Sequence, residues 1–186
     1  MTERRLKGVN FHGTLRALER RAGAATAERV RVRMEGEGGE ALRTGAILTG
    51  GWYPASWYDA LLVAIEAELP DQRTIVRDLA RAAVTDDFAT LFKVISLVAS
   101  PQMAVANTTR VLQRYVDGGT ARLIESREGF LHYAFEGFDG YTARMWDDFV
   151  GGMEAVLDLM RVERQQTRVV AAGDGPRCEV ILRYTR

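Results

Sequence analysis

Paired carboxylates are the first residues in this sequence that could do chemistry. Asp86 is followed by Asp87, and Asp147 by Asp148. Two carboxyl groups that share one site can act as general acid and base, but adjacent residues of a helix project about 100° apart. Neither pair is therefore expected to form a catalytic dyad. We interpret Asp86 or Asp87 as the residue that caps the start of a helix.

Nucleophiles and metal ligands are as sparse. None of the four serines lies in a G-x-S-x-G turn, and the only histidines are His12 and His132, which fall in different predicted elements. Cys178 occupies the apolar face of a predicted strand, which is typical of a small core residue. Glycine-rich phosphate-binding motifs do not occur. We assign no catalytic residue, metal ligand or cofactor, and expect that the chain is not an enzyme.

A binding pocket for a small molecule is the chemistry that remains. Aromatic residues crowd positions 52–58 beside a glycine-rich stretch, and Asn107 brings a polar group into an apolar one. Aromatic walls with a few polar groups are typical of ligand pockets, although an ordinary core has the same composition. The candidate ligand contacts are Trp52, Tyr53, Trp57, Asn107 and Trp146.

Composition limits the class of protein. The chain has 186 residues, 47% of them apolar and 27% charged, and a formal net charge of zero. This fits a single soluble domain over residues 1–186 and argues against nucleic-acid binding. The longest uncharged run, residues 94–109, is too short and too polar to span a membrane. One cysteine and a polar N-terminus without an apolar segment predict a cytoplasmic location.

Charge is nevertheless uneven along the chain. Residues 1–33 contain nine basic side chains and three glutamates, whereas residues 136–158 are mostly acidic. Solvated helix faces with pairing inside the chain would explain this pattern. A self-complementary homodimer or an acidic partner protein would explain it as well, with Arg20, Arg21 and Arg29 at the interface.

The residues after 119 predict a hairpin, a long helix and a second hairpin. Leu131, Tyr133 and Phe135 alternate with polar or small residues, as do the residues from Cys178 to Tyr184, which is the period of a half-buried strand. Between them, apolar residues recur at helical spacing from Met145 to Met160. Gly151 and Gly152 fall inside this helix, which indicates a close approach to the sheet or to another crossing element.

The residues before 119 predict about six helices. The first two cover residues 11–22 and 24–34. The glycine-rich residues 36–53 are expected to be irregular, either as a functional loop or as a covering segment in which Ala46, Ile47 and Leu48 dock on the core. Pro54, Pro70 and Pro101 are each expected to open a helix, with a further helix starting near Asp86. The predicted fold is α+β, in which helices over residues 1–118 pack on a ββαββ unit with a four-stranded antiparallel sheet over residues 119–186.

This order of elements resembles the superfamily that unites haem–nitric-oxide-binding (H-NOX) domains, four-vinyl-reductase-type (V4R) domains and the Bet-type subunits of TRAPP complexes. Within it, the chain resembles a paralogous family of unknown function that is expanded in myxobacteria. The matching stretches are residues 6–11 (LKGVNF), 15–19 (LRALE), 52–54 (WYP), 58–62 (YDALL), 149–152 (FVGG) and 175–180 (GPRCEV).

The sequence departs from the haem-binding members. H-NOX domains hold haem through a histidine in a helix of the N-terminal half and through a Tyr-x-Ser-x-Arg motif. The comparable residues here are Met103 to Ala106, without histidine, and the motif does not occur. Haem is therefore not expected. V4R domains imply a hydrophobic ligand and Bet-type subunits imply dimers with an acyl-chain channel.

We therefore expect a non-enzymatic regulatory or sensory module that takes a hydrophobic small molecule between helices and sheet. The alternative is an interaction or scaffold domain that acts as a homodimer without a ligand.

Overall fold

The computed structural model describes residues 3–95, 112–159, 163–171 and 173–185. The helices are α1 (Gly8–Ala22), α2 (Ala24–Arg33), α3 (Gly36–Arg43), α4 (Ala55–Glu68), α5 (Ile75–Ile95) and α8 (Ala143–Leu159). The strands are β1 (Arg5–Lys7), β2 (Trp52–Pro54), β3 (Thr120–Arg127), β4 (Phe130–Glu136), β5 (Glu163–Ala171) and β6 (Cys178–Thr185).

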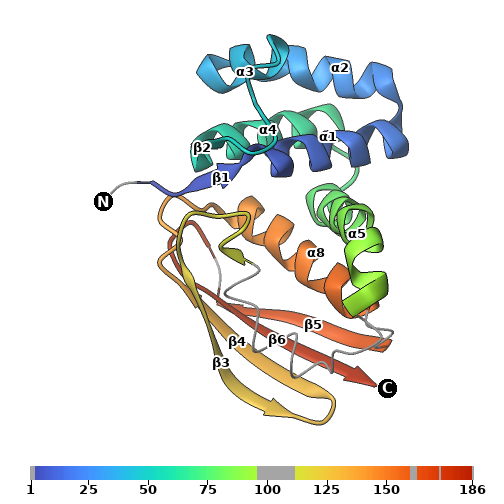
Figure 1. The fold of residues 1–186 in the computed structure, drawn as a ribbon, viewed down its shortest axis with the longest axis vertical. Coiled ribbons are helices and arrows are strands. Elements are labelled where there is room, and N and C mark those ends of the chain that lie inside the picture. Colours follow the sequence, from blue (N-terminus) through green and yellow to red (C-terminus); the bar gives the residue numbers. More distant parts are fainter. Residues whose placement is uncertain (1–2, 96–111, 160–162, 172, 186) are drawn as a thin grey trace.

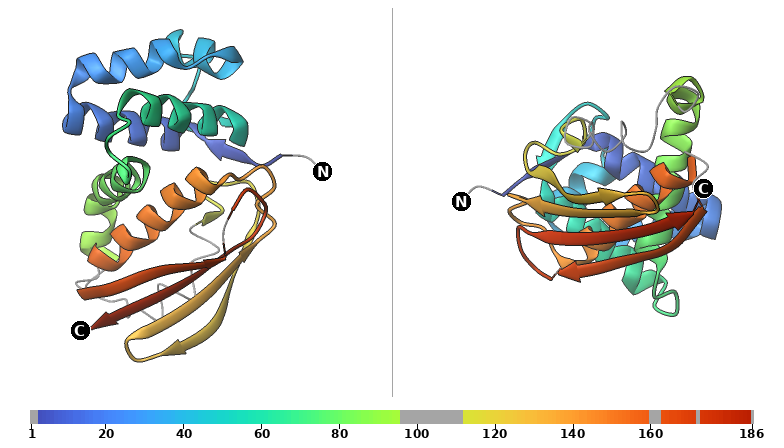
Figure 2. Two further views of the ribbon diagram at one scale, coloured as in Figure 1. Left: turned by 180° about the vertical axis from the view of Figure 1, so that it is seen from behind. Right: turned by 90° about the horizontal axis from the view of Figure 1, so that it is seen from below.

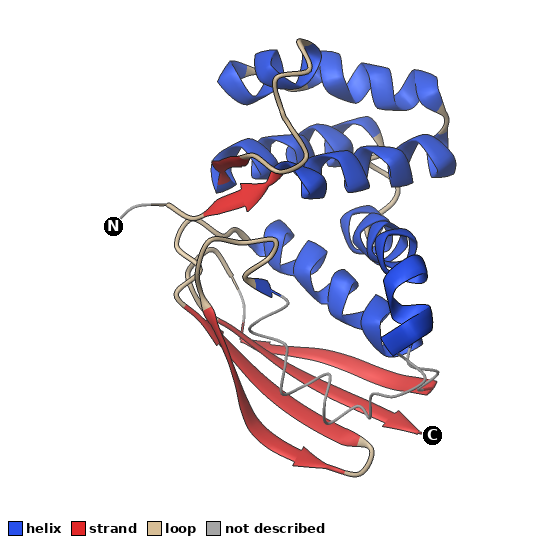
Figure 3. Ribbon diagram, viewed as in Figure 1, coloured by secondary structure: helices blue, strands red, loops and turns tan. Residues whose placement is uncertain are grey.

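These elements stack in layers (Figure 1). The outermost layer contains α2 and α3, the next α1 and α4, and below them α5 crosses α8, which lies over the four-stranded sheet. Helices and strands are separated along this axis, apart from the short β1–β2 pair at the side of α1 and α4 (Figure 3). The predicted α+β class, with helices on a ββαββ unit, is confirmed.

The large sheet has the order β3-β4-β6-β5, and every neighbouring pair is antiparallel. The register places Leu131, Tyr133 and Phe135 opposite Leu182, Val180 and Cys178, all on the face that α8 covers. Phe149 and Met153 of α8 pack against this core, as the helical spacing predicts. The alternation in the sequence therefore identified the buried face correctly.

Gly151 lies where α8 crosses α5 rather than where it meets the sheet. A Cβ atom at this position would fall on the carbonyl oxygen of Arg77 and 3.1 Å from Cβ of Ala80. The crossing is fastened by two ion pairs one turn apart, Arg77–Glu154 and Arg81–Asp158. The close approach is confirmed, and its partner is α5.

Residues 36–53 are not one irregular stretch, so this prediction is wrong, although Ile47 does dock in the core while Leu48 is exposed. Residues 36–43 form α3, where Gly38 packs so closely on α4 that a Cβ atom would lie 2.7 Å from Cγ of Trp57. Residues 52–54 form β2, which pairs with β1. Glycine lowers the intrinsic helix propensity, but here it also permits the contact that stabilises the helix.

The predicted division of residues 70–99 into two helices is also wrong. A single helix, α5, runs from Ile75 to Ile95 and contains Asp86 and Asp87 in its interior, so neither residue is a cap. The helix predicted from Pro70 starts five residues later, and Pro54 ends β2 immediately before α4. The helix predicted from Pro101 lies outside the described residues.

Candidate functional site: a polar junction between helices and sheet

Three polar side chains meet where the upper helices rest on α8. Tyr58 of α4 is buried, and its hydroxyl donates a hydrogen bond of 2.9 Å to Oδ1 of Asp148 in α8. Oγ1 of Thr14 in α1, also buried, lies 2.7 Å from the same hydroxyl. We call these three residues the junction triad. It links three helices with one chain of hydrogen bonds.

The triad forms because each helix turns one polar atom out of an otherwise apolar face. Around Thr14, α1 buries Phe11, Leu15 and Leu18; around Tyr58, α4 buries Leu61 and Leu62. The ring of Phe11 packs edge-on against that of Tyr58, with centroids 5.1 Å apart. Thr14 and Tyr58 are buried and Asp148 is half-buried, so the hydroxyls of the two buried residues find their partners within the triad.

The same burial shifts proton affinity. It raises the pKa of Asp148 to about 7, although the hydrogen bond from Tyr58 opposes the shift. It also raises the pKa of Tyr58, and the charge of Asp148 adds to this effect. The pKa of Tyr141 is raised by burial and then by Asp148. Near neutral pH the site therefore holds one carboxyl group that can change charge beside two neutral phenols.

An ionic rim lies beside the triad. Asp59 of α4 accepts hydrogen bonds from Thr142 (2.6 Å) and Arg144 (3.2 Å), which stand at the start of α8. Nε of Arg144 also donates to Glu66 over 3.0 Å. Helix α4 therefore contacts α8 through the hydrogen bond of the buried Tyr58 and through the more exposed ionic contacts of Asp59 and Glu66.

Aromatic clusters flank the triad on both sides. In the helical part, Tyr53 stacks on Trp57 (5.8 Å between centroids) and contacts Phe11 edge-on (5.9 Å). Over the sheet, Trp146 packs on Tyr141 (4.8 Å) and Phe138 (5.1 Å), and further contacts lead to Phe135 and Phe149. The junction triad lies between these two clusters.

The predicted ligand contacts therefore fall in two places. Tyr53 and Trp57 belong to the helical cluster, and Trp52 beside them carries the ammonium group of Lys7 at 5.1 Å from its ring. Trp146 is buried in the sheet cluster, where its indole N–H donates to the carbonyl oxygen of Gly175 (3.0 Å). Asn107 lies outside the described residues.

The junction triad was not predicted. Asp148 belongs to one of the acidic pairs, and the pair indeed shares no site, because Asp147 is exposed while Asp148 contacts Tyr58. Tyr58 follows the predicted ligand contact Trp57, but its position relative to Leu61 and Leu62 is that of a core residue. The sequence offered one signal for the triad: Asp148 lies two positions after Trp146 in a helix that is otherwise largely apolar.

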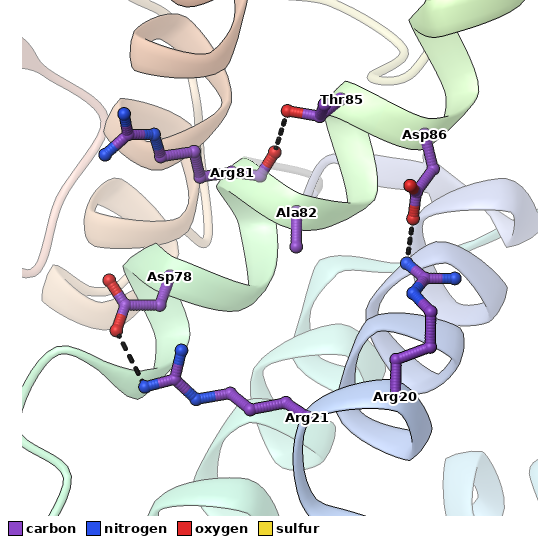
Figure 4. Close-up of a pocket in the computed structure, with 7 residues that line it drawn as sticks. All are labelled: Arg20, Arg21, Asp78, Arg81, Ala82, Thr85 and Asp86. Atoms are coloured by element: carbon purple, nitrogen blue, oxygen red, sulfur yellow. Dashed lines mark hydrogen bonds and ion pairs between the residues drawn. The ribbon is translucent and has the colours of Figure 1, made fainter.

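An open groove of about 420 Å³ lies elsewhere, between α1 and α5 (Figure 4). Its charges are engaged: Arg20 pairs with Asp86, Arg21 with Asp78 (3.1 Å), and the guanidinium of Arg81 points out of the groove toward α8. Arg29 pairs with Glu68. The basic residues expected at a dimer interface are therefore neutralised inside the chain.

Metal ligands do not converge in the described part of the chain, where no group of three acidic, histidine or cysteine side chains could hold an ion. Nε2 of His12 lies 2.7 Å from the carbonyl oxygen of Ile47, and Nε2 of His132 lies 3.2 Å from Glu179. Cys178 is buried, and burial raises the pKa of its thiol to about 12.

Among the helices described, none is long and apolar enough to cross a bilayer.

Comparison with known proteins identifies the fold. No family model and no curated protein sequence matches the chain. Solved H-NOX structures do: the Fe(II) unliganded protein from K. algicida (16% identity, TM-score 0.71) and an Fe(II) mutant from S. oneidensis (9%, 0.74), each with 97% of both chains covered. An oxygen-binding H-NOX domain related to soluble guanylate cyclases matches at 14% identity and TM-score 0.64, over 97% of this chain and 96% of that one.

These likenesses establish an H-NOX-like fold. The relation to V4R domains and to the myxobacterial family stays a prediction. The fold raises the question of haem, and the residues of this chain do not fit a histidine-ligated haem. Both histidines of the sequence are bound to other groups, His12 to the backbone beside α1 and His132 to Glu179 on the sheet face opposite α8.

Proposed function

We propose that this protein is a non-enzymatic regulatory module of H-NOX-like fold that binds a hydrophobic small molecule between its helices and its sheet, without haem held by histidine. The observation that carries the proposal is the junction triad between two aromatic clusters. A molecule that shifts α8 on the sheet would change the distance between Tyr58 and Asp148, and with it the position of α1 and α4.

Apolar surface on the inner face of the sheet supports a hydrophobic ligand. Leu123 stands opposite Tyr133 on the face that α8 covers, yet 39% of it remains exposed. Phe149 and Met153 of α8 and Ala121 of β3 contact the core but are only partly buried. An apolar molecule placed against Leu123 and Met153 would cover this surface, and hydrophobic burial would supply the affinity.

The triad favours regulation over catalysis. Burial raises the pKa of Asp148 to about 7, but its carboxylate accepts a hydrogen bond from the buried Tyr58 and does not line the open groove. The open groove between α1 and α5 holds paired arginines and aspartates, which have no free group to act as acid or base.

Native mass spectrometry and solvent extraction of the purified protein test this proposal. We expect a retained hydrophobic molecule, and no Soret absorption after expression with a haem precursor. The variant Leu123→Glu should lose the molecule, whereas Val32→Glu, at an equally apolar but remote exposed position of α2, should retain it. Stoichiometric haem, or retention that both variants lose equally, would contradict the proposal.

A further inference from the structure

The sheet face turned away from α8 carries four arginines, Arg122, Arg127, Arg168 and Arg183, and three glutamates, Glu125, Glu136 and Glu179. Viewed from below, no described helix covers this face (Figure 2, right). Across β3, β4, β6 and β5 the register gives a row of Arg127, Phe130, Arg183 and Gln166, a row of Glu125, His132, Ile181 and Arg168, and a row of Arg122, Ala134 and Glu179. A last pair, Thr120 and Glu136, follows at the end of β3 and β4. We call these residues the outer face.

Two glutamates of the outer face, Glu125 and Glu179, are already engaged, and the third, Glu136, lies at the end of β4 away from Arg168 and Arg183. Glu125 pairs with Arg127 at 2.8 Å, and Glu179 accepts from His132 at 3.2 Å. Arg122, Arg168 and Arg183 are exposed and form no ion pair with any described residue. By contrast, the arginines of α1, α2 and α5 described above are paired within the chain.

The outer face also has an apolar part, made by Phe130 and Ile181, and two arginines lie over the ring of Phe130. Phe130 is only 9% exposed, because the guanidinium of Arg127 lies 4.4 Å and that of Arg183 5.9 Å from its ring centroid. Ile181 is partly buried beside it. Arginine stacked on an aromatic ring keeps its donors directed outward, which is suited to binding carboxylates.

We propose that the outer face docks an acidic amphipathic helix of a partner protein. Neighbouring rows lie about 6.7 Å apart along the strands, and carboxylates at positions i and i+4 of a helix are about 6 Å apart, so the two spacings match. Apolar residues of the same helix would cover the partly buried Ile181. The partner helix would then pack on the outer face of the sheet in the same way as α8 packs on the opposite face.

The pattern of charge decides between partner classes. Nucleic acid would bring closely spaced phosphates against Glu125 and Glu179 as well as against the arginines, and the chain as a whole has no net charge to attract it. A helix that alternates carboxylates with apolar residues meets attraction at the arginines and no like charge at the glutamates. The face therefore selects a protein partner.

Fluorescence anisotropy with a labelled synthetic helix of glutamate and leucine, about 18 residues long so that it can form a helix, tests the proposal. We expect binding that weakens between about 50 and 300 mM salt and that Arg168→Glu/Arg183→Glu reduces about ten-fold. The control Arg73→Glu/Arg114→Glu makes the same charge change at exposed residues off the outer face, and should change affinity less than about two-fold.

The inference would be overturned if the acidic helix did not bind the wild-type chain, if both double variants lost affinity equally, or if a DNA duplex bound more tightly. Self-association that the outer-face variant abolishes would overturn it too, since the occupant would then be a second copy. The variant Arg168→Gln/Arg183→Gln removes the two charges without reversing them. We expect it to lose less affinity than the glutamate variant, whereas misfolding would not follow the change in charge. Retention of a small molecule is measured separately, so failure of one proposal leaves the other standing.

Discussion

The hydroxyl of Tyr58 donates to the carboxylate of Asp148 across ninety positions of the sequence, and this hydrogen bond joins α4 to α8. Without it, the half-buried carboxyl group of Asp148 would lose the donor that Tyr58 provides. Several measurable properties of the protein depend on this contact and on the helix crossing beside it.

Replacing Tyr58 with Phe should lower the free energy of unfolding by about 1–3 kcal/mol, because Asp148 and Thr14 lose their shared partner. Urea denaturation at pH 8 measures this loss. In the Asp148→Asn background the same replacement should cost less, which gives a coupling energy of at least about 0.5 kcal/mol. Strictly additive losses would show that the two side chains do not interact.

Protonation of Asp148 predicts a specific pH dependence. Its folded pKa of about 7 lies above that of an unfolded chain, so the folded state binds more protons and the stabilising contribution is lost as pH rises from about 4 to 7. Asp148→Asn should therefore gain stability relative to wild type over this range, by at most about 1.4 kcal/mol per pH unit. Parallel stability curves for the two proteins would contradict the shifted pKa.

The two adjacent glycines of α8 should respond in opposite ways. Gly151→Ala forces a methyl group onto the carbonyl oxygen of Arg77 and should destabilise the protein by about 1–3 kcal/mol. At Gly152 the nearest atom, Cγ2 of Val84, lies at 3.4 Å, so Gly152→Ala should be neutral or stabilise by up to about 1 kcal/mol. Thermal denaturation of both variants checks this, and equal shifts would mean that α5 does not press on α8.

The two ion pairs of this crossing should differ in strength. Glu154 is 5% exposed, so Glu154→Ala leaves Arg77 without its buried partner and should cost about 3–5 kcal/mol. Asp158 pairs with Arg81 nearer to solvent, and Asp158→Ala should cost less than about 1 kcal/mol. The comparison uses the same urea measurement, and similar costs would show that burial does not distinguish the pairs.

Local periodicity was enough to predict the C-terminal unit. The alternation around Tyr133 and Val180 identifies which side of each strand is buried, and the spacing in α8 identifies its inner face. Two glycines in that helix predicted a close crossing. Their sequence could not name the neighbour, because α5 reaches α8 only through the path of the chain between them.

The predictions from sequence were wrong where tertiary packing outweighs local conformational preference. The glycines of α3 are poor helix formers in isolation, but Gly38 fits against Trp57, and that contact depends on α4 being in place. Asp86 looked like a cap because of its type, whereas α5 continues past it and Arg20 of α1 supplies its partner.

The sequence by itself determined the fold class, the hairpin–helix–hairpin order of the C-terminal unit and the buried faces of β4 and β6, since these follow from residue types and from spacing within one element. Only the tertiary structure decided that Tyr58 meets Asp148, that the basic helices are neutralised internally, and that unpaired arginines gather on the outer face. Such relations join residues far apart in the chain, and the packing of helices and the strand register fix them, which no local pattern encodes.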